Sequence, residues 1–180
     1  MLKIAALVLA VAAVVFGARC VGIRKDLVTE RQTIGADWSQ VNNALERRTA
    51  LTPVLTKIVM SELPNDITAG VETQAVTNAC RDLQAAPGQH QKIQANARLD
   101  EALARLMLLV EAHPKIESSK QYGDVLEALK GAEYQIAVAR RKYNEAVEHY
   151  NARLDGFPEN LVSSVARLGK IDAYFQTAAP

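Results

Sequence analysis

A stripe of polar side chains between residues 133 and 151 is the first feature of the sequence that could bind a ligand. Glu133, Arg140, Asn144 and Asn151 follow one another in steps of seven, four and seven residues. In an α-helix these steps place the four side chains on nearly one face. One interpretation is a polar groove that binds a peptide or a partner helix. The other is structural: Arg140 pairs with a carboxylate, and the asparagines form hydrogen bonds between helices that fix their register.

Two arginines and a tryptophan upstream could face the same stripe. Arg47 and Arg48 lie on another predicted helix, where they would complete a network between helices; a site for an anionic ligand is the alternative. We expect Trp38 to pack as a core residue near the membrane end of that helix, with recognition of a partner as the alternative. These three residues and the four of the stripe are the candidate interaction or register residues.

The other residues that could carry chemistry form no familiar catalytic or metal-binding motif. His90, His113 and His149 are isolated, and the sequence has no Glu-x-x-His pair of the kind a di-iron bundle requires. It also lacks a haem-attachment motif, a glycine-rich phosphate loop and a nucleophile elbow. We read Cys20 and Cys80 as structural residues. We therefore expect no catalytic residues, no cofactor and no metal, with an enzyme site assembled from scattered residues as the alternative.

The charge balance argues against a nucleic-acid partner. The 180 residues include 21 Lys and Arg and 20 Asp and Glu, for a formal net charge of +1. A protein that binds DNA or RNA usually concentrates positive charge on one surface. These charges are typical of an ordinary solvated helical surface, and we expect no nucleic acid among the partners.

The amino-terminal residues predict a membrane anchor. Residues 4–18 contain no charged or strongly polar side chain, and residues 4–23 are interrupted only by Arg19. About 20 apolar residues span a bilayer core, and an arginine near a helix end can extend toward the interface. We therefore predict a transmembrane anchor in residues 1–23 that contacts the lipid bilayer through residues 4–23. A cleaved signal peptide is the alternative.

Flanking charges predict the orientation of this anchor. Lys3 and the terminal amine precede the apolar segment, whereas Arg19, Arg24 and Lys25 follow it. Positive charge favours the cytoplasmic side, so the domain after the anchor is expected in the cytoplasm. The predicted location is the bacterial inner membrane, crossed once.

Helical periodicity dominates the rest of the chain and predicts an all-α fold. Apolar residues recur at helical spacing, here called a seam, in residues 34–58, 66–86 and 93–112. Pro53 is expected to kink or restart the helix of residues 34–58. A short helix is expected from Glu159. Short connections between the helices favour an antiparallel up-and-down bundle of about four helices over residues 24–180. The longest seam repeats in steps of three and four through Tyr122, Val125, Leu129, Ala132, Ile136, Ala139, Tyr143, Val147, Tyr150, Leu154 and Phe157.

Two groups of residues stand out by their types and spacing. The first group comprises Trp38-Ser39-Gln40-Val41, Leu45, Arg47-Arg48, Leu51 and Pro53, and the second Glu111, Pro114, residues 133–144, Val147, Tyr150-Asn151, Phe157-Pro158 and Tyr174-Phe175. Together they resemble the signatures of LemA family proteins. The resemblance implies an N-terminal transmembrane helix and a helical bundle, and it implies no enzyme, because the family has no agreed catalytic residues or cofactor.

These observations predict a non-enzymatic, membrane-anchored scaffold or adaptor whose partner is an unidentified membrane or envelope protein. The alternative is an extracytoplasmic domain that binds a ligand or peptide, with its signal cleaved or its topology inverted. The sequence carries no feature that predicts the oligomeric state.

Overall fold

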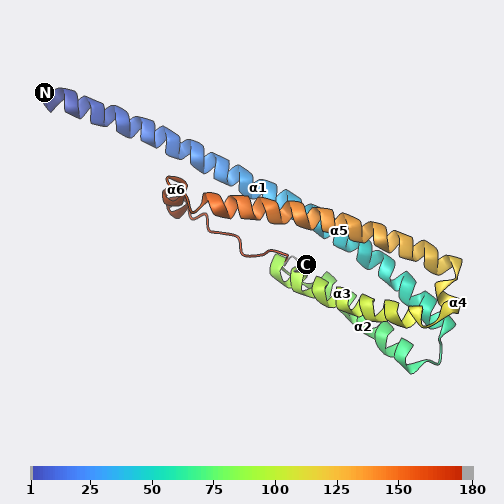
Figure 1. The fold of residues 1–180 in the computed structure, drawn as a ribbon. Coiled ribbons are helices and arrows are strands. Elements are labelled where there is room, and N and C mark those ends of the chain that lie inside the picture. The colour runs from blue at the N-terminus through green and yellow to red at the C-terminus, as the bar shows by residue number, and fades with distance from the viewer. Residues whose placement is uncertain (1, 176–180) are drawn as a thin grey trace. The chain divides into compact units, whose positions relative to one another are not determined.

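The computed structural model describes residues 2–175, except for the side chains of residues 2, 3, 5, 6 and 8. Within this part of the chain all regular secondary structure is helical, as the sequence predicts (Figure 1). The helices are α1 (Leu2–Glu62), α2 (Ile67–Ala85), α3 (Gln89–Glu111), α4 (Pro114–Glu117), α5 (Lys120–Arg153) and α6 (Glu159–Ala166).

The chain divides into two compact units. One unit, here called the bundle unit, contains residues 38–141 and the chain from Ala173 onward. The other, here called the paired-helix unit, contains the chain up to Asp37 and residues 142–172. The predicted division between an anchor of residues 1–23 and a domain of residues 24–180 stays a prediction.

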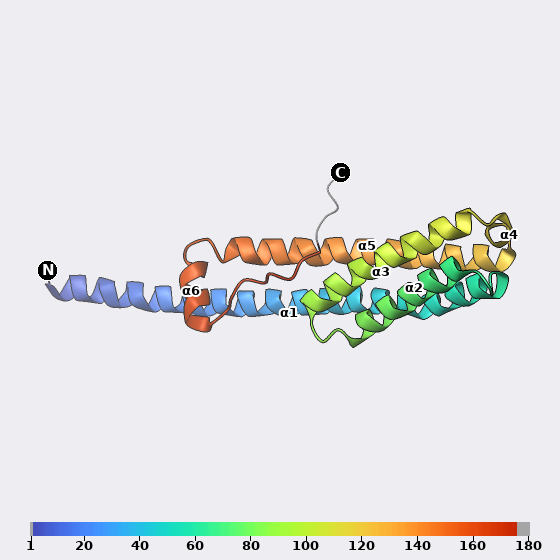
Figure 2. The same ribbon diagram turned by 90° about the horizontal axis from the view of Figure 1, so that it is seen from below.

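Four helical segments lie side by side in the bundle unit, and each runs antiparallel to the one before it (Figures 1 and 2). They are α1 from Trp38 onward, α2, α3, and α5 up to Arg141. The interior is aliphatic, as the periodic seams require. Its least exposed side chains include Val41, Leu45, Leu55, Val59, Val76, Leu99, Leu106, Val110 and Ile136.

Helix α1 continues through Pro53, where the sequence predicts a kink or a restart. A proline inside a helix has no N–H to donate to the carbonyl of the residue four before it, here Thr49, and this costs about 3 kcal/mol or more. Leu45 on one side of the proline and Leu55 and Val59 on the other are at most 2% exposed. Burial of this apolar face on both sides of Pro53 stabilises the uninterrupted helix.

The ends of the shorter helices follow from local sequence signals. Asp66 caps α2, because its carboxylate accepts a hydrogen bond from the backbone N–H of Ala69 at 2.8 Å. Pro87 and Gly88 separate α2 from α3. The sequence reading missed the short α4, which begins at Pro114, a residue suited to the first turn of a helix.

In the paired-helix unit, the end of α5 lies beside α1 (Figure 2). Lys142 Nζ of α5 lies 2.7 Å from Asp37 Oδ1 of α1, and Arg153 pairs with Glu30. The apolar residues Tyr143, Val147, Tyr150 and Leu27 are fully buried, and Ile34 is nearly so.

Helix α6 follows a turn at the end of α5 and runs across the direction of α1 and α5 (Figure 2). Glu159 in its first turn forms an ion pair with Arg153, in which Oε1 of the glutamate lies 3.5 Å from Nη2 of the arginine. Arg167 ends the helix in the left-handed region, with φ 55° and ψ 39°, and the N–H of Leu168 donates to the carbonyl of Ser163 at 2.9 Å. This hydrogen-bonded turn satisfies carbonyls that would otherwise lack partners.

The first part of α1 exposes most of its described apolar side chains. Ile4, Leu9 and Val14 are 69–72% exposed, and Phe16 is 47% exposed. Nevertheless, no helix among the described residues has the length and apolarity needed to cross a bilayer. The transmembrane part of the fold prediction therefore lacks support from the structure.

Candidate functional site

The polar centre of the bundle unit is Arg48, whose side chain is 3% exposed. Its Nη1 lies 2.5 Å from Asp100 Oδ1 of α3 and 2.8 Å from Glu133 Oε2 of α5. Its Nη2 donates a hydrogen bond to Asn96 Oδ1, also on α3. One guanidinium thus links three helices of the bundle unit.

The position of Arg48 on α1 explains this burial. Arg48 comes three residues after Leu45 and seven before Leu55, so it lies on the apolar face that the two leucines mark. Burying an ionised group without a partner is unfavourable, and the two carboxylates supply the missing charge. The Nε atom of Arg48 is buried and lacks a hydrogen-bond partner among the described residues.

Sequence analysis missed two members of this cluster, Asn96 and Asp100. They are four residues apart on α3, so they lie on one face, and Asn96 Nδ2 donates to Asp100 Oδ2 at 3.1 Å. Asn96 is 2% exposed, in spite of its polar amide. The sequence did hold a signal for them: Asn96 and Asp100 are four residues apart, as are the buried Leu99 and Leu103 beside them.

The surroundings of this cluster shift the pKa values of two groups. Burial raises the pKa of the Asp100 carboxyl, and the neighbouring Arg48 guanidinium opposes that rise. Burial also raises the pKa of the Cys80 thiol, opposed by a hydrogen bond from Thr52 and by the charge of Arg48. A buried thiol with a raised pKa is a poor nucleophile, which agrees with a structural role for Cys80.

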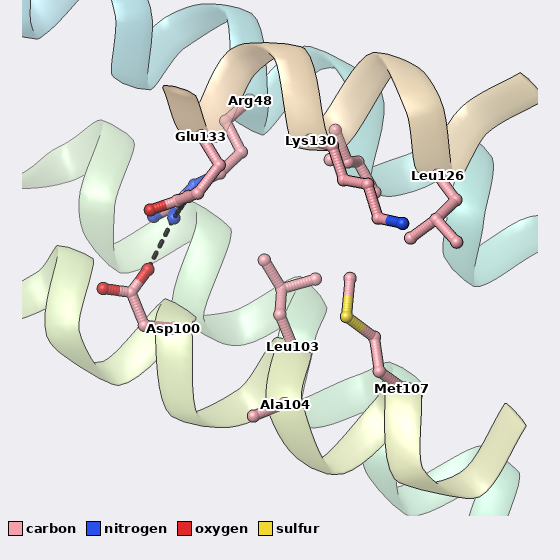
Figure 3. A pocket seen from close by; sticks show the side chains of 9 residues that line it. Arg48, Asp100, Leu103, Ala104, Met107, Leu126, Lys130 and Glu133 are labelled. Atoms are coloured by element: carbon pink, nitrogen blue, oxygen red, sulfur yellow. Dashed lines mark hydrogen bonds and ion pairs between the residues drawn. The ribbon is translucent and has the colours of Figure 1, made fainter. Parts of the chain in front are cut away.

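A largely apolar pocket of about 320 Å³ opens beside the cluster. Arg48, Asp100 and Glu133 meet at one end of it, and Leu103 and Met107 of α3 point toward Leu126 of α5 (Figure 3). Ala104, Leu129 and Lys130 complete its lining. The Lys130 amine lies near Leu126, away from the Arg48 cluster (Figure 3). A largely apolar pocket with charged groups at both ends suits the apolar side chain of a partner protein or a small amphiphilic ligand.

Three predicted site residues lie elsewhere in the bundle unit. Trp38 is half-buried, and its ring stacks on that of Phe175 with centroids 6.0 Å apart and planes at 24°. The guanidinium of Arg140 lies 4.6 Å from the centroid of the same Phe175 ring. Arg47 is exposed, and its Nη1 donates to Gln135 Oε1 at 3.0 Å. Of the two adjacent arginines, Arg48 therefore carries the buried network.

The two asparagines of the stripe belong to the paired-helix unit. Asn144 is half-buried on α5. Asn151 is 9% exposed, and its Nδ2 donates to the carbonyl of Ile171 at 2.7 Å while its Oδ1 accepts from the Ile171 N–H at 2.9 Å. Asn151 therefore fixes the irregular segment of chain after α6 at Ile171.

Metal binding has no structural counterpart in the described part of the chain. No group of three or more His, Cys, Asp or Glu side chains there is arranged to hold a metal ion. Asp100 and Glu133 both contact the guanidinium of Arg48. Their arrangement in residues 2–175 stabilises a positive charge that the protein itself supplies.

Known proteins similar to this chain point to one family. The model of the LemA family matches residues 37–180. Magnetosome protein MamQ 2 of Paramagnetospirillum magneticum is 33% identical over 82 residues, which are 46% of this chain and 30% of that protein. Magnetosome protein MamQ of Magnetospirillum gryphiswaldense is 25% identical over 85 residues, 47% of this chain and 31% of that protein. The matched region thus spans less than a third of the length of these curated relatives.

Proposed function

Because the chain belongs to the LemA family, we propose that it is a membrane-associated helical scaffold or adaptor that acts by binding a partner and not by catalysis. The observation that carries this proposal is the run of exposed apolar side chains on α1, including Ile4, Leu9 and Val14. In water such a surface is unfavourable, and contact with the acyl chains of a bilayer would remove it from solvent.

The amino-terminal segment supplies the bilayer contact in this proposal, through residues 4–23 as an anchor in the inner membrane of a bacterium. The residues after it add Arg24 and Lys25, which favour anionic headgroups at the cytoplasmic face. Two relatives are named magnetosome proteins, and those names belong to longer proteins of which the matched regions are 30% and 31%.

The pocket beside Arg48 supplies the partner contact. Its walls are apolar, and Asp100 and Glu133 at its end are 39% and 51% exposed, so a partner can reach them. We expect an apolar side chain of a membrane or envelope protein to enter between Leu103 and Leu126, with a neighbouring polar group of the partner near the carboxylates. The polar residues of the cluster are engaged with one another, which supports binding in preference to catalysis.

A liposome flotation experiment on the full chain tests the membrane association. We expect the protein, synthesised in the presence of phospholipid vesicles, to float with them. The double variant Leu9→Glu/Val14→Glu places charges in the apolar segment and should stay with the soluble fraction. The control, Leu108→Glu/Tyr134→Glu, alters two exposed apolar side chains of the bundle unit and should still float. A wild-type chain that fails to float would refute the proposal.

The alternative function is an extracytoplasmic domain that binds a ligand or peptide in the same pocket, with a cleaved signal or inverted topology. The pocket of about 320 Å³ favours it as a second candidate, since small-molecule sites begin near this size. Protease treatment of a carboxyl-terminal tag in intact and lysed spheroplasts separates the two. Protection until lysis supports the cytoplasmic adaptor, and digestion in intact spheroplasts supports the alternative.

A further inference from the structure

Helix α6 presents an apolar face to solvent beside the amino-terminal part of α1. Leu161 and Val165 are four residues apart, so they share one face, and they are 49% and 81% exposed. Val162 and Ser163 are buried, and Val162 lies next to the exposed pair on the helix. A short helix with apolar side chains on its outer face resembles helices that lie in the interface of a membrane.

A hollow of about 640 Å³ lies between α6 and α1 within the paired-helix unit. Its walls are mainly apolar, and they include Phe16 and Val21 of α1, which are 47% and 70% exposed. Leu161 and Val165 of α6 line the same hollow. Its apolar surface is therefore continuous with that of the amino-terminal segment.

Positive charges border this apolar surface. Arg24 of α1 and Arg167 at the end of α6 line the hollow, and both are exposed. Arg19 and Lys25 add further positive charge on α1, against the single acidic Asp26 in the same stretch. Glu159, the acidic residue in the first turn of α6, is already paired with Arg153. An apolar floor bordered by cations complements the acyl chains and phosphates of an anionic phospholipid.

The position of α6 along α1 agrees with a contact to phospholipid headgroups. The apolar run of residues 4–18 ends where the hollow begins, at Phe16 and Cys20. If the apolar run lies among acyl chains, Arg24 lies one to two turns beyond it, at the level of the headgroups. Leu161 and Val165 line the same hollow as Phe16 and Arg24, so they lie at the same level along α1.

We propose that α6 is an interfacial helix, which rests on the surface of an anionic phospholipid bilayer. Leu161 and Val165 enter the boundary between headgroups and acyl chains, the upper part of one acyl chain fills the hollow between α6 and α1, and Arg24 and Arg167 contact lipid phosphates. This inference rests on the proposed membrane association and adds a second contact to it.

Spin labels on the full chain test the position of α6. In a Cys20→Ser/Cys80→Ala background, a nitroxide is attached at Val165→Cys or, as the matched control on the same helix, at exposed Asn160→Cys. The protein is reconstituted in vesicles of equimolar phosphatidylcholine and phosphatidylglycerol. We expect the label at residue 165 to collide more with oxygen, which concentrates among acyl chains, and the label at residue 160 to collide more with a water-soluble nickel complex.

The outcomes separate this inference from the proposed function. A chain that floats with the vesicles while the label at residue 165 remains as water-accessible as that at residue 160 overturns the interfacial helix and leaves membrane association intact. A chain that does not float overturns both. Circular dichroism of each labelled protein confirms that a change of accessibility does not reflect unfolding.

A charge variant tests the phosphate contacts with the same readout. Arg24→Gln/Arg167→Gln should shift the label at residue 165 toward water, because two contacts to anionic headgroups are lost. Arg98→Gln/Lys115→Gln removes the same charge from exposed positions of the bundle unit and should leave the label unchanged. An equal response to the two double variants would refute a specific role for Arg24 and Arg167.

Discussion

Arg48 and Asp100 form an ion pair at 2.5 Å in which the guanidinium is buried and the carboxylate reaches water, with side chains 3% and 39% exposed. Glu133, the second carboxylate on Arg48, is 51% exposed. The guanidinium is therefore the least exposed of the three charged groups. The two carboxylates balance its charge from the edge of the bundle unit.

Replacement of Arg48 should destabilise the protein. Arg48→Met leaves two neighbouring carboxylates without their cation and Asn96 without a donor, so we expect the free energy of unfolding to fall by about 1–3 kcal/mol. Because both carboxylates can regain water, the loss should be smaller than in Asp100→Asn/Glu133→Gln, which leaves a buried guanidinium without a charged partner. Urea denaturation followed by circular dichroism measures both.

Arg47 provides the matched control for this prediction. It is adjacent in sequence and has the same charge, but it is exposed and donates one hydrogen bond, to Gln135. Arg47→Met should change the free energy of unfolding by no more than about 0.5 kcal/mol. Equal losses in the Arg47 and Arg48 variants would contradict the central role given to Arg48.

The raised pKa of Asp100 predicts how its contribution depends on pH. A carboxyl whose pKa is higher in the folded than in the unfolded chain favours folding below its unfolded pKa, and this contribution is lost as pH rises through the folded pKa. The window therefore begins near the ordinary value of 3.8 and extends upward. The stability of the wild type relative to Asp100→Asn should fall as pH rises across this window. Urea titrations at a series of pH values would contradict the prediction if that difference rose instead.

Periodicity was sufficient to predict the long helices, because it depends on local spacing, whereas the family was predicted from the resemblance of particular residues to its signatures. The all-α fold and the LemA resemblance are confirmed. At Pro53 the helix does not restart, because Leu55 and Val59 beyond it are buried, and a local rule does not include that burial; the predicted kink stays a prediction. The partners of Arg48 were only partly foreseen: Glu133 was a candidate, but Asp100 and Asn96 became visible only when α3 was placed beside α1.

The polar stripe shows a second limit of sequence reasoning. Its four residues share a face of one helix, yet Glu133 and Arg140 belong to the bundle unit and Asn144 and Asn151 to the paired-helix unit. The binding role of the stripe stays a prediction. The partner of Asn151 is the backbone of Ile171, which has no side-chain pattern that a sequence could reveal.

Loss of the Asn151 amide should release the segment after α6. Asn151→Ala removes two hydrogen bonds to Ile171, so we expect a loss of about 1–3 kcal/mol in stability. The amide of Ile171 should also exchange its hydrogen faster, as mass spectrometry of deuterated peptides can measure. Asn160→Ala, at an exposed position of α6, is the control and should preserve protection at Ile171. Unchanged exchange in the Asn151 variant would show that other contacts hold this segment.

Cys80 should react with thiol reagents only when the bundle unit opens. It is 8% exposed, and burial raises its pKa, so both access and the fraction of reactive thiolate are reduced. In a Cys20→Ser variant, we expect Ellman's reagent to modify Cys80 at least about tenfold more slowly in buffer than in denaturing urea. An exposed cysteine introduced as Ala97→Cys, in a chain without Cys20 and Cys80, should react rapidly in both. Rapid modification of native Cys80 would mean that the helices around it separate often, and that the bundle unit is far more open than its buried core implies.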